Sequence, residues 1–176
     1  THASGVKNQL QKFDPTTNTV TTLQDVQETQ WYNHNSDILF CGGSMYILMN
    51  GGSSLFKADL DGSNPVKIVG AFRWNTRDGA RIQALLGRPK AFARYRTKLY
   101  ILQNHRFDVL DLATMTLSFM AGRSADAYTD GVGDVARVSG PTQMAISPDG
   151  VNLYFGDRNN NRIRYLNTTT NEIKTL

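Results

Sequence analysis

The sequence predicts an all-β fold in which a four-stranded antiparallel unit is repeated about three and a half times. Two observations predict it: landmark residues recur at a nearly constant displacement, and each copy is a series of short apolar segments separated by turn residues. A four-stranded unit repeated around an axis is a blade of a β-propeller. We therefore expect a partial or open β-propeller, built as one propeller-like domain or as two lobes.

The repeat is strongest between the middle and the last third of the chain. Asp130 follows Asp78 by 52 positions, and a glycine, an alanine and a proline keep the same displacement. These further landmarks are Gly79, Ala84 and Pro89 in one copy and Gly131, Ala136 and Pro141 in the next. An apolar segment recurs over residues 44–47, 98–101 and 152–155. We predict a half blade over residues 1–23 and blades over residues 24–69, 70–120 and 121–176.

The last unit shows the expected strands most clearly. Its apolar segments cover residues 143–146, 151–156, 162–166 and 172–176, and the residues between them are turn formers such as proline, glycine and asparagine. Residues 74–86 lack this alternation and are expected to form a loop. Asp130, Asp157 and Asn161 are residue types typical of turns, and we expect them to support the packing of one blade on the next.

The composition predicts a soluble, turn-rich globular chain, with 40% hydrophobic residues and 15 glycines. No apolar run approaches the roughly 20 residues of a membrane helix, and the start lacks a basic segment followed by an apolar one. We therefore expect membrane attachment only through a segment outside this sequence. The single cysteine, Cys41, excludes an internal disulfide and is expected to be a small buried hydrophobic residue.

The charge of the chain is unevenly distributed. The net charge is +4, but residues 70–107 contain nine arginines and lysines and a single acid, Asp78. Such a patch favours an anionic partner, although charges on the outer face of a sheet also keep strands soluble. Residues 13–30 hold acids and no base, so a nucleic acid is an unlikely partner.

The sequence favours binding over catalysis. It has three histidines, His2, His34 and His105, and no pair of residues containing one of them has metal-ligand spacing. A phosphate-cradling glycine loop and a nucleophile elbow are both missing from the sequence. We therefore predict no catalytic residues, no metal and no cofactor, and an unidentified small molecule or protein as the ligand.

Loops on a rigid scaffold are where recognition residues tend to lie, and arginine and tryptophan dominate many interfaces. Arginines that flank an aromatic side chain or stand at the start of a strand are therefore the candidates for ligand binding. The six candidate residues are Arg73, Trp74, Arg77, His105, Arg106 and Arg123. Asn167 begins the triplet Asn-Thr-Thr, which makes it a candidate glycosylation site in a secreted protein.

The last unit resembles an NHL repeat. The resemblance rests on Asp130-Gly131, Gly140-Pro141, Asp149-Gly150, the segment 153–155, and a tail of Asp157, two asparagines and the pair Ile163-Arg164. It is weaker over residues 70–120, where Gln103-Asn104-His105-Arg106 replaces the Asp-Asn-Arg pattern, and weakest over residues 24–69. Membership in this family implies a propeller that binds ligands with the loops at one end.

As a whole, the chain also resembles the outer portion of the insect-stage surface antigens of trypanosomes. That resemblance implies a non-enzymatic recognition or sensor ectodomain at the cell surface. The alternative is an intracellular NHL-type scaffold for RNA or protein, or a fragment of a larger propeller, because some NHL propellers bind single-stranded RNA on a basic face.

Overall fold

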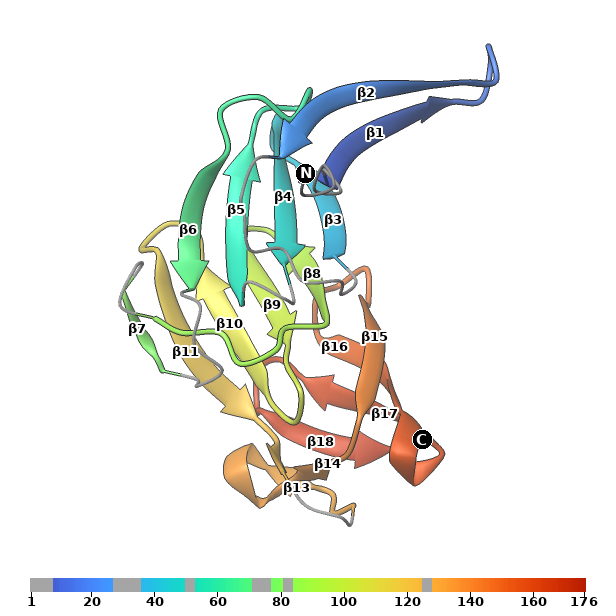
Figure 1. Cartoon of the computed structure of the whole chain (residues 1–176). Coiled ribbons are helices and arrows are strands. Elements are labelled where there is room, and N and C mark those ends of the chain that lie inside the picture. Colours follow the sequence, from blue (N-terminus) through green and yellow to red (C-terminus); the bar gives the residue numbers. More distant parts are fainter. Residues whose placement is uncertain (1–7, 27–35, 50–52, 71–76, 81–83, 125–127) are drawn as a thin grey trace, which may run out of the picture.

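The computed structural model describes residues 8–26, 36–49, 53–70, 77–80, 84–124 and 128–176. Nearly all of the regular structure in these residues is β-strand (Figure 1). Two single-turn 3-10 helices, η2 (Gly133–Val135) and η3 (Arg158–Asn160), lie in the last third of the chain. The all-β prediction is confirmed.

The strands form three larger sheets, which follow one another along the chain. The first sheet has the order β3-β4-β5-β6, the second β7-β11-β10-β9-β8 and the third β13-β18-β17-β16-β15. The strands of these sheets are β3 (Ser36–Cys41), β4 (Ser44–Met49), β5 (Ser54–Ala58), β6 (Val66–Gly70), β7 (Gly79–Ala80), β8 (Ala91–Tyr95), β9 (Lys98–Leu102), β10 (Phe107–Asp111), β11 (Thr116–Ala121), β13 (Gly131–Val132), β15 (Pro141–Ile146), β16 (Asn152–Asp157), β17 (Arg162–Asn167) and β18 (Glu172–Thr175). Every pairing within them is antiparallel, as expected for propeller blades.

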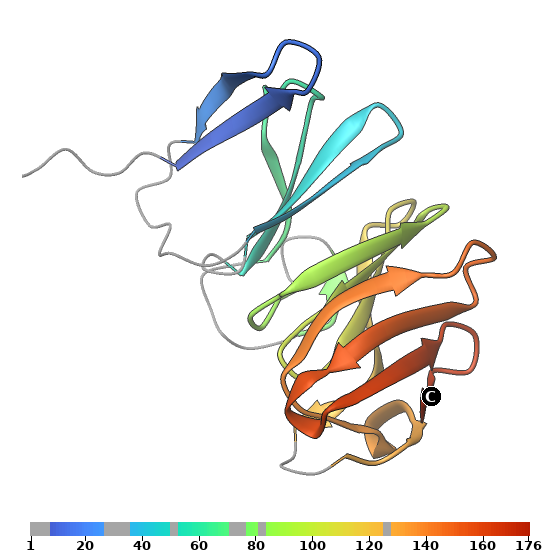
Figure 2. The same ribbon diagram turned by 90° about the vertical axis from the view of Figure 1, so that its right-hand side faces the viewer.

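Two smaller sheets complete the fold. β1 (Asn8–Asp14) and β2 (Thr19–Val26) form an antiparallel hairpin, and β12 (Arg123–Ser124) pairs in parallel with β14 (Arg137–Val138). Figure 2 shows the sheets stacked in chain order, with the β1–β2 hairpin at one end and the sheet of β15 to β18 at the other. This arrangement agrees with the predicted partial or open propeller, while the exact limits of the blades stay a prediction.

The second and third sheets each have a fifth strand that the sequence did not predict. β7 pairs with β11, and β13 pairs with β18, so each adds a short strand beside the last strand of its sheet. Both begin at the glycine of an Asp-Gly landmark, Gly79 and Gly131, which are 52 positions apart. β7 therefore corrects the expectation that residues 74–86 form only a loop, although residues 74–76 and 81–83 lie outside the described residues.

Two apolar clusters hold the three sheets together. Strand β9 explains why: alternate side chains of a strand point to opposite faces, and both faces of this strand are apolar. Leu99 and Ile101 pack with side chains of the first sheet such as Leu55, whereas Tyr100 and Leu102 pack with side chains of the third sheet such as Phe155. The second sheet is therefore buried on both faces, and face-to-face packing fixes the positions of its neighbours. Cys41 is half-buried against the apolar cluster between the first and second sheets, rather than fully buried as expected.

A buried polar network supports the third sheet. The Arg164 side chain on β17 is fully buried, and its two Nη atoms donate to Asp157 Oδ2 at 2.8 Å and to Asp130 Oδ1 at 2.9 Å. Asp157 Oδ1 accepts from the Ser139 amide at 2.8 Å, and Asp130 Oδ2 accepts from the Thr175 amide at 3.0 Å. Asp130 and Asp157 thus hold strands of the last unit together, and a role in packing one blade on the next stays a prediction.

The second sheet has a similar network, in which the buried charged residue is an aspartate rather than an arginine. Asp108 on β10 is buried and forms an ion pair with Arg106, which also pairs with Asp78. Gln103 takes the place of Asp157: it donates to Asp108 and accepts from the Gly87 amide. Burial raises the pKa of Asp108 to about 6, although the adjacent Arg106 acts in the opposite direction. Each of the two sheets thus has a network of hydrogen bonds and ion pairs around a buried charged residue, built from different residues.

Candidate functional site

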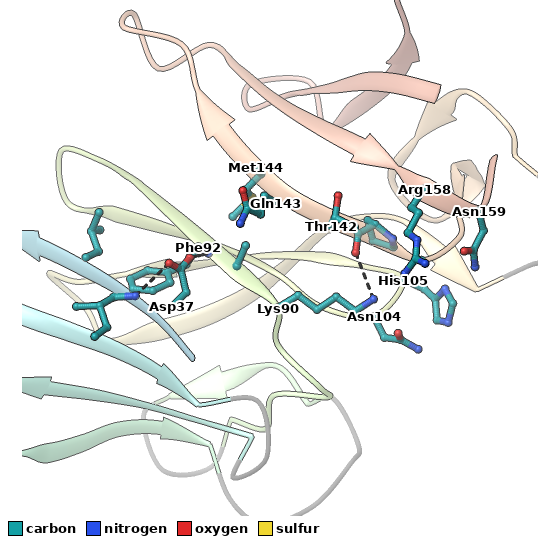
Figure 3. A pocket seen from close by; sticks show the side chains of 15 residues that line it. Asp37, Lys90, Phe92, Asn104, His105, Thr142, Gln143, Met144, Arg158 and Asn159 are labelled. Atoms are coloured by element: carbon teal, nitrogen blue, oxygen red, sulfur yellow. Dashed lines mark hydrogen bonds between the residues drawn. The ribbon is translucent and has the colours of Figure 1, made fainter. Parts of the chain in front are cut away.

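A hollow of about 1060 Å³ lies where the first strands of the three sheets meet. These strands, β3, β8 and β15, are the ones through which the sheets approach each other: β8 contacts both β3 and β15. Each is an edge strand of its sheet with one neighbour, β4, β9 or β16, so the three together form a shared wall. In a propeller the corresponding strands face the central axis, and Figure 3 shows side chains from all three sheets around this hollow.

One part of the wall joins the first sheet to the second. Asp37 Oδ2 accepts a hydrogen bond from the backbone amide of Phe92 at 3.2 Å, and its Oδ1 accepts from the amide of Ile38 at 3.0 Å. β8 therefore uses one of its edge amides on a side chain of β3. Phe92 itself is only 5% exposed and presents little ring surface to the hollow.

The opposite part of the hollow is cationic. Lys90 Nζ donates to the carbonyl oxygen of Pro141 at 3.2 Å, which holds the ammonium group between the second and third sheets (Figure 3). Burial lowers the pKa of Lys90, and the nearby charges of Arg158 and Arg88 lower it further. Within the described part of the chain, neither Lys90 nor Arg158 forms an ion pair with an acid.

Neutral polar groups surround these cations. Asn104 and His105 come from the turn that precedes β10, and Asn159 comes from η3. His105 Nδ1 lies 3.1 Å from the carbonyl oxygen of Val138, and Asn159 Nδ2 donates to Ser139 Oγ at 3.2 Å. Thr142, with Gln143 beside it, is exposed on β15. The hollow thus offers two cations, amides and a hydroxyl, and its one acid, Asp37, lies at the other end.

The structure brings one of the six predicted binding residues to this hollow, His105. Arg73 and Trp74 lie outside the described residues. Arg77 is exposed, and its backbone pairs with that of Leu85.

Two further candidates also lie away from the hollow. Arg106 is engaged by Asp78 and Asp108, with its guanidinium 4.9 Å from the centre of the Phe119 ring, and Arg123 is exposed on β12. Asn167, the predicted glycosylation site, is at the end of β17, and its Oδ1 accepts from the amides of Thr169 and Thr170.

Sequence reasoning missed the other residues of the hollow, among them Lys90, Asn104 and Arg158. Each of these three had a signal in the repeat. Lys90 directly follows the landmark Pro89, and Arg158 directly follows the landmark Asp157. Asn104 stands in the second unit where Arg158 stands in the third, 54 positions later. Equivalent positions of adjacent blades lie at the same end of a propeller, so the period alone could have paired Asn104 with Arg158 and Lys90 with Thr142, but it does not bring the two pairs together.

The described residues contain no group of three or more histidine, cysteine, aspartate or glutamate side chains that could hold a metal ion. They also contain no helix long and apolar enough to cross a membrane.

Comparisons with known proteins show the fold. No family model and no curated protein matches the chain. Among solved structures, a protein of unknown function from Bacteroides thetaiotaomicron matches with a TM-score of 0.76 and 18% identity over 89% of this chain. Two auxiliary nutrient binding proteins match with TM-scores of 0.72 and 0.74: one from B. thetaiotaomicron, with 22% identity over 95% of the chain, and one from Bacteroides ovatus, with 20% identity over 97%.

This chain spans less than half of each of these neighbours, namely 41%, 43% and 44% of their lengths. At this level of identity the likeness supports the β-rich, propeller-like architecture. The NHL assignment and the narrower resemblance to trypanosome surface antigens stay predictions.

Proposed function

We propose that this chain is a non-enzymatic ligand-binding domain and that its ligand occupies the hollow between β3, β8 and β15. The observation that carries the proposal is the convergence there of Lys90 and Arg158, two cations from different sheets without an acidic partner in the described part of the chain. Concave sites with a few convergent polar groups are where proteins usually bind small molecules.

The structural neighbours support a binding role. Two of them carry the name auxiliary nutrient binding protein, and they share the overall fold of this chain with TM-scores of 0.72 and 0.74. A fold by itself does not assign a function, so the weight of the proposal rests on the residues of the hollow.

We propose further that the domain is a recognition or sensor module of NHL-like blades at a cell surface. The repeat pattern and the sequon at Asn167 support this more specific assignment. The alternative, an intracellular scaffold for RNA, is less well supported, because neither aromatic ring among the described residues of the hollow is fully exposed: Phe92 is buried and His105 is half-buried. Single-stranded nucleic acids are usually held by exposed aromatic rings on which bases stack.

The experiment that tests the proposal is NMR of the isotope-labelled chain with four probes: glucose, glucuronate, glutamate and adenosine monophosphate. We expect at least one probe to shift the amide signals of Phe92, His105 and Gln143 on the wall of the hollow. The variant Thr142→Trp places a large side chain in the hollow and should abolish these shifts. Thr170→Trp, in the exposed turn between β17 and β18, is the matched control and should leave them unchanged.

Three results would overturn the proposal. Shifts confined to residues outside the hollow, and unaffected by Thr142→Trp, would place the ligand elsewhere. Conversion of any probe into a new compound in the same samples would show an enzyme rather than a binding domain. If no probe shifts any amide signal, the hollow lacks affinity for these classes of small polar ligand and the proposal fails.

A further inference from the structure

Resting on the proposed function, we infer that the hollow selects a small polyhydroxylated anion, with its negative group between Lys90 and Arg158 and its hydroxyl groups against the neighbouring amides and the Thr142 hydroxyl. Sugar acids and sugar phosphates share this chemistry. The inference names the class of ligand, which neither the fold nor the structural neighbours specify.

The position of the charges is the first reason. Lys90 lies close enough to Arg158 and Arg88 for their charges to repel, and the acid of the hollow, Asp37, already accepts two backbone amides at the other end. Lys90 is half-buried, whereas Arg158 and Arg88 are exposed, so water screens part of the repulsion between these like charges. An anion between Lys90 and Arg158 removes that repulsion and gains two charge-assisted contacts.

The hydrogen-bonding capacity of the two cations is the second reason. An ammonium group has three donors and a guanidinium has five. Lys90 uses one donor on the Pro141 carbonyl, a contact that fixes the ammonium group at the rim of the hollow while its other hydrogens stay available (Figure 3). A carboxylate or phosphate presents several oxygen acceptors and can satisfy both cations at once.

The rest of the wall argues for hydroxyl groups on the ligand. Asn104, Asn159 and Gln143 carry amides that both donate and accept, and the Thr142 hydroxyl does the same. Such side chains match the hydroxyl groups of a sugar. Among the apolar residues of the hollow, Ala91, Phe92 and Pro141 are buried, whereas Ile38 is 39% exposed and Leu39 and Met144 are half-buried. The hollow therefore has some apolar surface for the carbon skeleton of a ligand beside its polar groups.

The size of the hollow limits the size of the ligand. Its volume of about 1060 Å³ is slightly above the roughly 300–1,000 Å³ typical of small-molecule sites. One or two sugar residues fit in this space. A site of this size also leaves room for water to bridge the amides and the ligand.

The test is isothermal titration calorimetry of the whole chain with glucuronate, glucose 6-phosphate, glucose and inorganic phosphate. We expect one or both of the sugar anions to bind at least about tenfold more tightly than glucose, since one charge-assisted hydrogen bond is worth roughly a factor of ten. The carboxylate and the phosphate arms identify which anionic group the site prefers. Inorganic phosphate, which lacks the hydroxylated body, should bind more weakly than glucose 6-phosphate.

Two variants test the residues directly. Lys90→Gln and Arg158→Gln should each weaken binding of the preferred sugar anion by about tenfold or more, and should weaken binding of uncharged glucose less than that. Lys98→Gln is the matched control: Lys98 is exposed on β9, outside the hollow, and its loss removes the same charge. Circular dichroism and thermal melting of all three variants verify that the fold is intact.

The possible failures separate this inference from the proposed function. If glucose binds as tightly as the sugar anions and Thr142→Trp abolishes binding, the hollow is a binding site but selects a neutral ligand, and the inference alone is wrong. Equal binding of inorganic phosphate and glucose 6-phosphate would refute the part played by the hydroxyl groups. Absence of binding for all four compounds overturns the inference, whereas the proposed function then depends on the NMR experiment with glutamate and adenosine monophosphate.

Discussion

Replacing Arg164 by methionine should strongly destabilise the third sheet. The Arg164 side chain is fully buried and joins Asp157, which is also fully buried, to Asp130, which is 42% exposed. Its guanidinium also donates to the carbonyl oxygens of Arg137 at 2.6 Å and Thr129 at 2.8 Å. Methionine fills part of the space but can make none of these contacts.

The loss in the free energy of unfolding can be estimated from the acidic groups that lose their partner. Asp157 keeps its bonds from the Ser139 amide and from Asn160 Nδ2 but loses its only cation in the described residues. Removing one partner of a buried ion pair costs about 3–5 kcal/mol. Asp130 adds little because it is exposed to water. We therefore expect Arg164→Met to lower the free energy of unfolding by about 4 kcal/mol, and the melting temperature by roughly 10 °C in a chain of this size.

The assay is urea unfolding followed by circular dichroism, with the double variant Arg164→Met/Asp157→Asn beside the single one. Asparagine keeps an acceptor for the Ser139 amide and removes the buried charge, so the double variant should regain about 2 kcal/mol. Lys174→Met is the matched control: Lys174 pairs with Glu172 at 3.1 Å on the same sheet, but it is exposed, and its loss should leave the melting temperature unchanged. A single variant as stable as this control, or a double variant no more stable than the single one, would refute the reasoning.

Three further predictions concern other parts of the fold. The pKa of Asp108 is about 6 in the folded chain against an ordinary value of 3.8, so the folded state holds its proton over a pH range in which the unfolded state has lost it. Relative to Asp108→Asn, the wild type should lose about 2 kcal/mol between pH 4 and pH 7, measured by urea unfolding at each pH. Gly122→Ala should destabilise the chain by roughly 3 kcal/mol more than Gly43→Ala, because both glycines have positive φ but only at Gly122 does an added Cβ lie 2.7 Å from a backbone oxygen; equal losses in urea unfolding would contradict this. Binding of the preferred sugar anion should weaken as the pH rises through the lowered pKa of Lys90 and should be independent of pH in Lys90→Gln, as calorimetry at increasing pH will show.

The sheets could be predicted from the sequence because their signals are local and repeated. Turn residues mark the ends of the strands, and a displacement near 52 positions keeps the Asp-Gly and proline landmarks in register. β7 and β13 could not be predicted, since a strand of two residues has no alternation to detect. The structure shows that the Asp-Gly landmarks at Gly79 and Gly131 are the starts of these two strands.

The buried networks show where the sequence pattern was insufficient. In the third sheet the acid stands at the end of β16 and the base on β17, as in Asp157 and Arg164. In the second sheet the base precedes β10 and the acid lies on it, as in Arg106 and Asp108. When the second and third units are aligned by sequence position, this difference looks like a loss of the repeat. Only the three-dimensional contacts show that an ion pair with a buried member is present in both sheets, and that Arg106, proposed from its residue type as a binding residue, is held in such a pair.

The repeat also explains why the two ends of the hollow carry opposite charges. Lys90 of the second unit occupies the position of Thr142 in the third, and Asn104 of the second unit occupies that of Arg158 in the third, so each pair combines one cation with one neutral group. The first unit adds the acid, Asp37, at the far end of the hollow. Identical residues at equivalent positions would have made the wall uniform. Different residues make one end cationic and the other acidic, which is the asymmetry needed to hold a ligand that has a negative group at one end and hydroxyl groups along its length.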